Sequence, residues 1–183
     1  MRPIAFLIVA CLLRGAAADP AALSDQAQKL AAVGRPVEAE KLWRQALGIS
    51  PHFFPALFNL GYLLFKQDKF TEAEPLLRRA TQALRDDFNS NYLLGATLAK
   101  LGRSEDALRA WREALRIQPD HPSLMQVMAV EYSKGRYFGE AADLARRAIE
   151  IRGNEPNSYF LAIKAYQDAG DDTTATDLAS RAA

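Results

Sequence analysis

The chain has 183 residues, of which 49% are hydrophobic and 25% are charged, a balance typical of a folded globular protein rather than of a disordered chain or a multi-span membrane protein. Its formal net charge at pH 7 is only +1, and no stretch of the sequence is strongly basic. Because proteins that bind nucleic acid neutralise its phosphates with clustered lysine and arginine, nucleic acid is not expected as a partner.

The first eighteen residues have the pattern of a secretory signal. Arg2 supplies the positive start, Ile4–Leu13 the short apolar core, and Ala16 and Ala18 the small side chains that precede a cleavage site. We expect cleavage after Ala18, a mature chain that begins at Asp19, and a periplasmic or secreted location. The apolar core of about ten residues, at about 1.5 Å each in a helix, is too short for a hydrocarbon core of about 30 Å, so no membrane span is expected.

A second interpretation of this segment starts from Cys11, the only cysteine of the chain. Ile8, Val9, Ala10 and Cys11 resemble the cleavage box of bacterial lipoproteins, in which the cysteine carries the lipid and becomes the first mature residue. Cleavage there would leave an apolar core of only about seven residues. It would produce a lipid-anchored protein, and under either interpretation the mature chain has no internal disulfide.

The mature chain is a series of sequence repeats with a period of about 34 residues. Alanine recurs at this interval without a slip, at Ala39, Ala73, Ala107, Ala141 and Ala175. Each unit contains an apolar pattern of helical period, a break, and a second such pattern, which predicts two helices joined by a short turn. The units cover about residues 20–53, 54–87, 88–121, 122–155 and 156–183.

The units differ in detail along the chain. The first opens with Asp19 and Pro20, an N-cap followed by proline at the first helical position. The second begins with a helix, Phe53–Phe65, that is apolar on nearly every side. The third is the most regular and the fourth is a looser copy. The fifth has the fewest large apolar residues, and three threonines lower the helix propensity of its last helix, whose polar outer face would suit a terminal cap.

The third unit resembles a known family. The small, apolar and turn residues at its fixed spacings resemble the tetratricopeptide repeat, and they are Leu94, Gly95, Leu98, Gly102, Ala107, Trp111, Ala114 and Pro119. The resemblance extends over the mature chain and implies an all-α fold, a right-handed superhelical solenoid of about five helix-turn-helix repeats. The chain departs from the family pattern because no unit has the early tryptophan, Ile163 replaces a small residue, and Arg85 and Gly153 stand where a proline ends other units.

No sequence motif for catalysis, phosphate binding or metal coordination is present, so no catalytic residue, metal or cofactor is expected. The two histidines, His52 and His121, adjoin prolines between units, which favours a solvated or capping role over metal binding. Two arginine pairs fall on second helices and are interpreted as solvated outer-face residues: Arg78 with Arg79, and Arg146 with Arg147.

Two tandem acidic pairs, at residues 86–87 and 171–172, precede predicted helix starts. Negative charge is favourable there because of the free N–H groups, so the pairs are interpreted as caps rather than as acid–base or calcium sites. Trp43 and Trp111 share one repeat position and are expected in the core.

The candidate binding residues lie on first helices. Phe58, Tyr62 and Phe65 fall at i, i+4 and i+7, on positions that the resemblance places on the concave surface, and Tyr92 and Phe160 repeat the place of Phe58. The alternative for these aromatic residues is packing against the first repeat.

Three lysines, Lys66, Lys100 and Lys134, recur at the repeat period beside the same surface. An aromatic floor next to a short row of positive charge would hold an extended apolar segment with acidic flanks. The alternative for the lysines is an ordinary solvated position.

The sequence therefore favours a scaffold that binds a protein or peptide in its concave groove. A terminal carboxylate is not specifically expected, because the lysine and asparagine pattern of the carboxylate clamp in some members of the family is replaced by Ser24, Gln28, Tyr62 and Ala96. The alternatives are a lipid-anchored envelope assembly factor or structural spacer and, least supported, an enzyme.

Overall fold

The computed structural model describes residues 19–151 and 156–182, and over these residues the chain forms ten α-helices and no strand. None of these described helices is long and apolar enough to span a membrane. The expected signal segment, Cys11 and Gly153 lie outside the described residues. The helices are α1 (Pro20–Ala32), α2 (Pro36–Ile49), α3 (Phe54–Lys66), α4 (Phe70–Ala83), α5 (Phe88–Lys100), α6 (Ser104–Ile117), α7 (Pro122–Lys134), α8 (Phe138–Ile151), α9 (Pro156–Asp168) and α10 (Asp172–Ala182).

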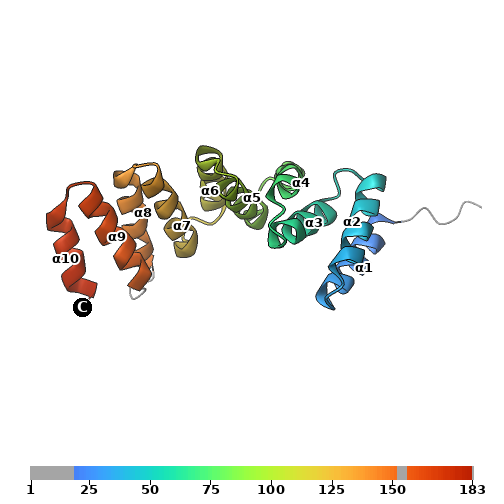
Figure 1. Cartoon of the computed structure of the whole chain (residues 1–183), viewed down its shortest axis with the longest axis horizontal. Helices are drawn as coiled ribbons and strands as arrows, with labels where there is room; N and C mark the ends of the chain where they lie inside the picture. Colours follow the sequence, from blue (N-terminus) through green and yellow to red (C-terminus); the bar gives the residue numbers. More distant parts are fainter. Residues whose placement is uncertain (1–18, 152–155, 183) are drawn as a thin grey trace, which may run out of the picture.

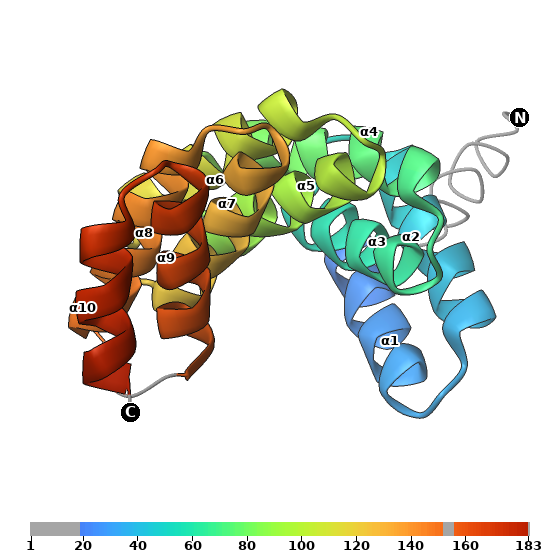
Figure 2. The same ribbon diagram turned by 60° about the vertical axis from the view of Figure 1, so that its left-hand side comes forward.

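The helices form five successive pairs that stack along the molecule (Figure 1). The first helices begin at Pro20, Phe54, Phe88, Pro122 and Pro156, each one repeat period after the one before. From another direction the stack is an arch, in which α1, α3, α5, α7 and α9 lie along the inner side and the second helices along the outer side (Figure 2). We call the inner side the concave face. The all-α solenoid predicted from the sequence is confirmed.

Each pair turns at a residue with a left-handed backbone, and these residues are also spaced by the repeat period. Their φ angles are 77° at Gly34, 58° at Asp68, 74° at Gly102, 63° at Arg136 and 82° at Gly170. Glycine adopts this conformation freely and aspartate tolerates it, whereas a long side chain is disfavoured there. At Arg136 the geometry of the repeat therefore overrides the local preference of the residue.

Side chains cap several helices as the sequence predicts. Asp19, Asp87 and His121 each accept a hydrogen bond from a backbone N–H two or three residues further on, at 2.7–3.1 Å, and Asp171 caps α10 in the same way at 3.0 Å. Such bonds satisfy N–H groups that a helix leaves free at its start. Asp86 differs from the expectation, because its carboxylate pairs with an arginine of α6 at 2.7 Å and not with a helix N-terminus.

The core lies between the two helices of each pair and between neighbouring pairs. Trp43 and Trp111 are buried at equivalent positions of α2 and α6, as expected. A Cβ on Gly95 would overlap the indole of Trp111, so only glycine lets α5 and α6 approach this closely. Gly61 has the same role in the second pair, where an added Cβ would lie 2.8 Å from Cδ2 of Leu77. The small and bulky residues of the repeat are thus matched across each pair.

Candidate functional site

The aromatic residues predicted for the groove of α3 differ in exposure. The rings of Phe54, Phe58 and Tyr62 stack in succession, with centres 6.0 and 6.5 Å apart and planes nearly parallel. Phe58 is half-buried within this stack, and Tyr62 at its end is 48% exposed. Phe65 is half-buried and meets Phe70, at the start of α4, edge-on at 5.5 Å. Tyr62 therefore offers the most free surface of the expected stripe.

The aromatic residues of α5 and α9 also have different surroundings. Tyr92 is half-buried and stacks on Phe88 with ring centres 5.9 Å apart, and Phe88 stacks on the imidazole of His121 at 4.7 Å. Phe160 on α9 is 65% exposed. Tyr92 belongs to a partly packed cluster, whereas Tyr62 on α3 and Phe160 on α9 leave apolar surface exposed.

The three lysines lie in the last turns of α3, α5 and α7 and are exposed. The ammonium group of Lys134 pairs with the carboxylate of Glu131 at 2.8 Å. Lys66 and Lys100 form no ion pair with any residue in the described part of the chain. The lysines are thus not a uniform row, because one of them is already neutralised.

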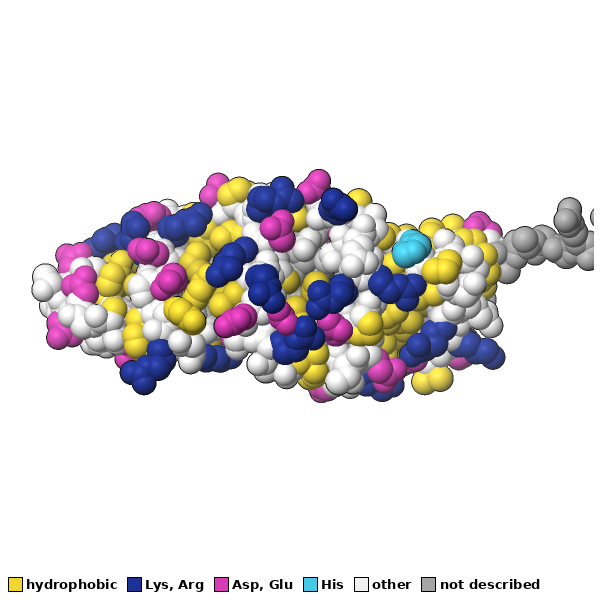
Figure 3. Space-filling view, turned by 90° about the horizontal axis from the view of Figure 1, so that it is seen from above, with side chains coloured by type: hydrophobic (Ala, Val, Ile, Leu, Met, Phe, Trp, Pro, Cys, Tyr) yellow, Lys and Arg dark blue, Asp and Glu magenta, His cyan; other side chains and the backbone are white. Residues whose placement is uncertain are grey.

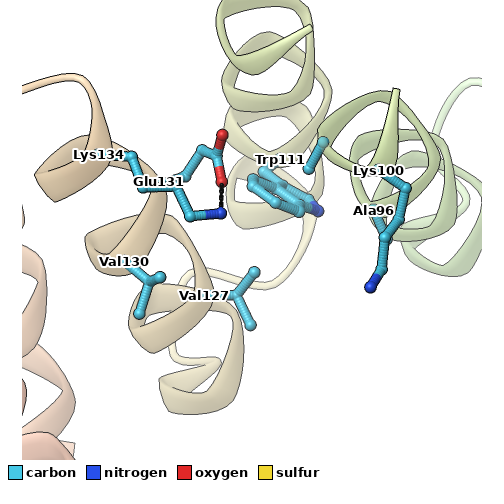
Figure 4. A pocket seen from close by; sticks show the side chains of 8 residues that line it. Ala96, Lys100, Trp111, Val127, Val130, Glu131 and Lys134 are labelled. Carbon is cyan, nitrogen blue, oxygen red and sulfur yellow. Dashed lines mark hydrogen bonds and ion pairs between the residues drawn. The ribbon is translucent and has the colours of Figure 1, made fainter. Parts of the chain in front are cut away.

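A hollow of about 280 Å³ opens between α5 and α7 (Figure 4). Ala96, Ala99 and Lys100 form its α5 side, and Val127 and Val130 face it from α7. Trp111 of α6 lies at its back, with its indole N–H donating to the backbone carbonyl of α5 at 3.0 Å. The floor and walls of the hollow are therefore mostly apolar.

The hollow exists because α5 carries small side chains where α3 carries large ones. Tyr62 and Phe65 precede Ala96 and Ala99 by one repeat period and occupy the equivalent places on α3. Two alanines leave free the volume that two aromatic rings would take. These two helix positions thus hold aromatic rings in the second pair and border a cavity in the third.

Glu131 brings a buried charge to the edge of this hollow, with its side chain only 4% exposed. Its carboxylate accepts a hydrogen bond from the hydroxyl of Ser104 on α6 and pairs with Lys134. Burial alone would raise the pKa of Glu131, but the hydrogen bonds from Lys134 and Ser104 outweigh it and hold the pKa below its ordinary value. Glu131 therefore stays ionised near neutral pH and connects α7 to α6.

A second hollow, of about 540 Å³, adjoins the first between α7 and α9. It shares Val130 and Lys134 with the first hollow and is bordered on its other side by Phe160, Lys164 and Asp168 of α9. The two hollows thus adjoin at Val130 and Lys134 and have both apolar and charged groups in their linings.

The remaining charges of the second helices are mainly paired with one another. Arg78, Arg146 and Arg147, predicted for the outer face, are exposed. Arg78 pairs with Glu74 at 2.5 Å and Arg146 with Glu150 at 2.6 Å. Arg79 differs from the expectation, because it is only partly exposed and its guanidinium donates to the backbone carbonyl of Pro51. In Figure 3, basic and acidic side chains are interspersed over the face seen from above rather than gathered in one patch of a single sign. Within the described residues, no three His, Cys, Asp or Glu side chains are grouped to hold a metal ion.

Sequence reasoning missed most of the residues that form the hollow. It selected the large residues of α3 and the lysines, but not Ala96, Ala99, Val127, Val130 and Glu131. A signal was present, since an alignment of the units shows alanine on α5 where α3 has tyrosine and phenylalanine. A cavity is marked by small residues, which a search for reactive or bulky side chains overlooks.

Two profiles of the tetratricopeptide repeat family match the chain, one over residues 30–96 and the other over residues 88–121. These matches agree with the repeated helix pairs and with the glycine–tryptophan contact between α5 and α6. The chain belongs to the tetratricopeptide repeat family.

Several curated proteins share part of this sequence. The human protein O-mannosyl-transferase TMTC3 is 27% identical over 139 residues, which are 73% of this chain and 15% of that protein. A putative beta-barrel assembly-enhancing protease of Vibrio cholerae is 31% identical over 94 residues, 51% of this chain and 19% of that protein. A TPR repeat-containing protein of Treponema pallidum is 36% identical over 95 residues, 51% of this chain and 12% of that protein. The chain spans less than a fifth of the length of these relatives.

Solved structures share the fold over nearly the whole chain. A crystal structure of the MamA protein superimposes with a TM-score of 0.82 at 16% identity and covers 89% of both chains. YrrB, described as a TPR protein with an unusual peptide-binding site, has a TM-score of 0.82 at 18% identity, covering 90% of this chain and 84% of YrrB. At such low identity the likeness establishes the fold alone.

Proposed function

We propose that this protein is a scaffold that binds a peptide, or an extended segment of a partner protein, on its concave face. The observation that carries the proposal is the apolar and basic surface left uncovered on the first helices: Tyr62 and Phe160 are about half exposed or more, and Lys100 has no ion pair within the described residues. Exposed apolar groups gathered on a hollowed face are typical of interaction surfaces. The peptide-binding site named for YrrB, which has the same fold, also supports it.

The chemistry of this face indicates a partner segment with large apolar residues and acidic neighbours. Aromatic side chains contribute large buried areas at low conformational cost, and positive charge at the rim favours acidic partners. Backbone groups of an extended segment would remain partly solvated in so open a groove, so the side chains must supply most of the selectivity.

A non-catalytic role is part of the proposal. The sequence contains no motif for nucleophilic catalysis, and within the described residues no three His, Cys, Asp or Glu side chains are grouped to hold a metal ion. The relatives named as a transferase and a protease are matched over only 15% and 19% of their lengths. The part that they share with this chain is therefore a fraction of each protein.

The proposed location is the periplasm or the cell exterior, reached by cleavage after Ala18. Mass spectrometry of the mature N-terminus in the native host tests this directly. A chain beginning at Asp19 would support secretion, and a lipidated Cys11 would support the anchored assembly factor instead. An uncleaved cytoplasmic chain would contradict both.

The binding proposal is tested with peptides selected from a random display library against the wild-type chain. Tyr62→Ala and Phe160→Ala should each weaken binding about tenfold or more, because each removes an exposed ring from the concave face. Val37→Ala is the matched control, since Val37 is an exposed apolar residue on a second helix. Melting temperatures should stay nearly unchanged in all three variants. Equal affinity in wild type and both ring variants would contradict the proposal.

A further inference from the structure

We propose that the hollow between α5 and α7 is an anchor pocket for one bulky apolar side chain of the bound segment, and that Lys100 pairs with a carboxylate beside that side chain. This inference rests on the proposed function and narrows the partner to segments in which a large apolar residue adjoins aspartate or glutamate.

The size of the hollow fits one such side chain. An enclosed apolar cavity of roughly 150 Å³ accepts benzene, and this hollow has about 280 Å³ with one side open to the partner. Ala96, Ala99, Val127 and Val130 give it apolar walls, and the indole of Trp111 closes the back. A phenyl or isobutyl group would be in contact with protein on several sides, whereas a methyl group would leave the hollow mostly unfilled.

The charges at the rim determine what lies next to the anchor. In Figure 4, Lys100 comes from the α5 side of the hollow, while Lys134 on the α7 side is held by Glu131. Because the charge of Lys134 is locally compensated, Lys100 is the rim cation that a partner carboxylate can neutralise without breaking an existing pair. The ammonium group of lysine acts as a point charge and lacks the fixed fork geometry of a guanidinium, so it can pair with the carboxylate of either aspartate or glutamate.

The pocket is a property of this junction rather than of every repeat. On α3 the equivalent places hold Tyr62 and Phe65, and on α7 they hold Val130 and Ser133. The α5 helix combines two alanines with a tryptophan behind them and a lysine beside them. This combination makes the third and fourth pairs the expected point of selectivity in the groove.

The first experiment exchanges residues between units. Ala96→Tyr gives α5 the side chain that α3 carries at the equivalent place and should fill the hollow. Gln28→Tyr is the matched control, because Gln28 is the equivalent, exposed residue of α1. The probes are four acetylated twelve-residue peptides of serine and glutamate that differ only in a central phenylalanine, leucine, alanine or lysine.

Wild type should bind the phenylalanine and leucine peptides at least tenfold more tightly than the alanine and lysine peptides. Ala96→Tyr should abolish this preference and Gln28→Tyr should preserve it. Lys100→Gln, which replaces the exposed rim cation and leaves the apolar walls unchanged, should weaken binding of the phenylalanine peptide about threefold to tenfold. Lys100→Gln should leave unchanged the affinity for the same peptide with glutamine in place of glutamate.

A local readout places the bound side chain. The chain has two tryptophans, so a ¹⁵N–¹H spectrum contains two indole resonances, and only Trp111 lines the hollow. Binding of the phenylalanine peptide should shift the Trp111 resonance and leave that of Trp43 unchanged.

The outcomes separate this inference from the proposed function. If the four peptides bind alike, or if Ala96→Tyr retains the preference, the pocket is wrong, while sensitivity to Tyr62→Ala would still support concave-face binding. If neither these probes nor peptides selected from the library bind, both proposals are overturned. If Ala96→Tyr fails to fold, the Lys100→Gln comparison and the Trp111 shift decide the result.

Discussion

At the residue scale, the distance between α5 and α6 depends on the missing side chain of Gly95. Gly95→Ala should lower the free energy of unfolding by about 1–3 kcal/mol, because the new methyl group must displace the buried indole of Trp111. Gly48→Ala is the control, with an expected effect of opposite sign. Apart from its chain neighbours and the backbone of its own helix turn, no atom lies within 4 Å of the added Cβ, so this substitution should raise the free energy of unfolding by about 0.5–1 kcal/mol. Urea unfolding of both variants measures these changes. A harmless Gly95→Ala would show that the two helices can separate freely.

The turn at Arg136 is a second place where one residue conflicts with the repeat. A non-glycine residue in the left-handed region costs about 1–2 kcal/mol, part of which is offset by the greater flexibility of glycine in the unfolded chain. Arg136→Gly should therefore raise the free energy of unfolding by about 0.5 kcal/mol, and the reciprocal Gly102→Arg should lower it by about 1 kcal/mol. Thermal unfolding followed by circular dichroism compares them. The idea fails if both substitutions change stability in the same direction.

At the scale of helices, α10 should be the first element to open. It has 11 residues, whereas α6 has 14, and only Ala175 and Leu178 of α10 are buried. Because units of a solenoid contribute to stability roughly additively through their neighbours, an element with little buried apolar surface at the end of the stack opens at low free energy. Native-state hydrogen exchange should give the amides of α10 far less protection than those of α6. Equal protection would refute this order.

The sequence predicts these helices well because their signal is local and repeated five times. Alanine at the position of Ala107 recurs in every unit and marks the period, while Gly102 and Trp111 mark the turn and the packing face within the third unit. The candidate site is predicted less well, because the hollow is formed between units: Ala96 and Val127 belong to different pairs, and neither has an unusual side chain. The buried state of Glu131 also depends on Ser104, which belongs to the preceding pair. Contacts of this kind follow from the stacking of pairs, which the period alone does not specify in detail.

At the scale of the whole molecule, the junction between the third and fourth pairs differs from the others. The contact between α7 and α6 is less extensive than the contact between α9 and α8 or between α5 and α4. Polar contacts connect it: Glu131 bonds to Ser104, and the guanidinium of Arg112 donates to the hydroxyl of Tyr132 at 2.8 Å. The anchor hollow lies at this same junction, so its shape depends on interactions that respond to ionisation more than an apolar contact would.

This arrangement predicts that acid weakens the junction through Glu131. Since its pKa is lower in the folded chain than in the unfolded chain, the ionised carboxylate stabilises the fold above the unfolded pKa of about 4.3, and this stabilisation is lost as pH falls through the folded pKa. At pH 7, Glu131→Gln should lower the free energy of unfolding by about 1.5–3 kcal/mol, because the amide keeps only one of the two acceptor oxygens that Ser104 and Lys134 use and loses the charge that pairs with Lys134. Between pH 5 and 3 (roughly, from the ordinary carboxyl range) the wild type should lose stability more steeply than the variant, so that the two curves converge.

The control for this comparison is Glu113→Gln, which removes an exposed carboxylate paired with Arg116 on the surface of α6. An exposed pair of this kind contributes little to stability, so its curve should follow that of the wild type. Asp106 and Asp171 also have lowered pKa values, because of hydrogen bonds from Arg103 and Thr174 respectively, and their acid response has the same sign. Both aspartates are present in the wild type, in Glu131→Gln and in Glu113→Gln. Their contributions to stability therefore cancel in the difference between the wild type and Glu131→Gln. Parallel curves of stability against pH for the wild type and Glu131→Gln would show that the Glu131 contacts do not hold the third and fourth pairs together.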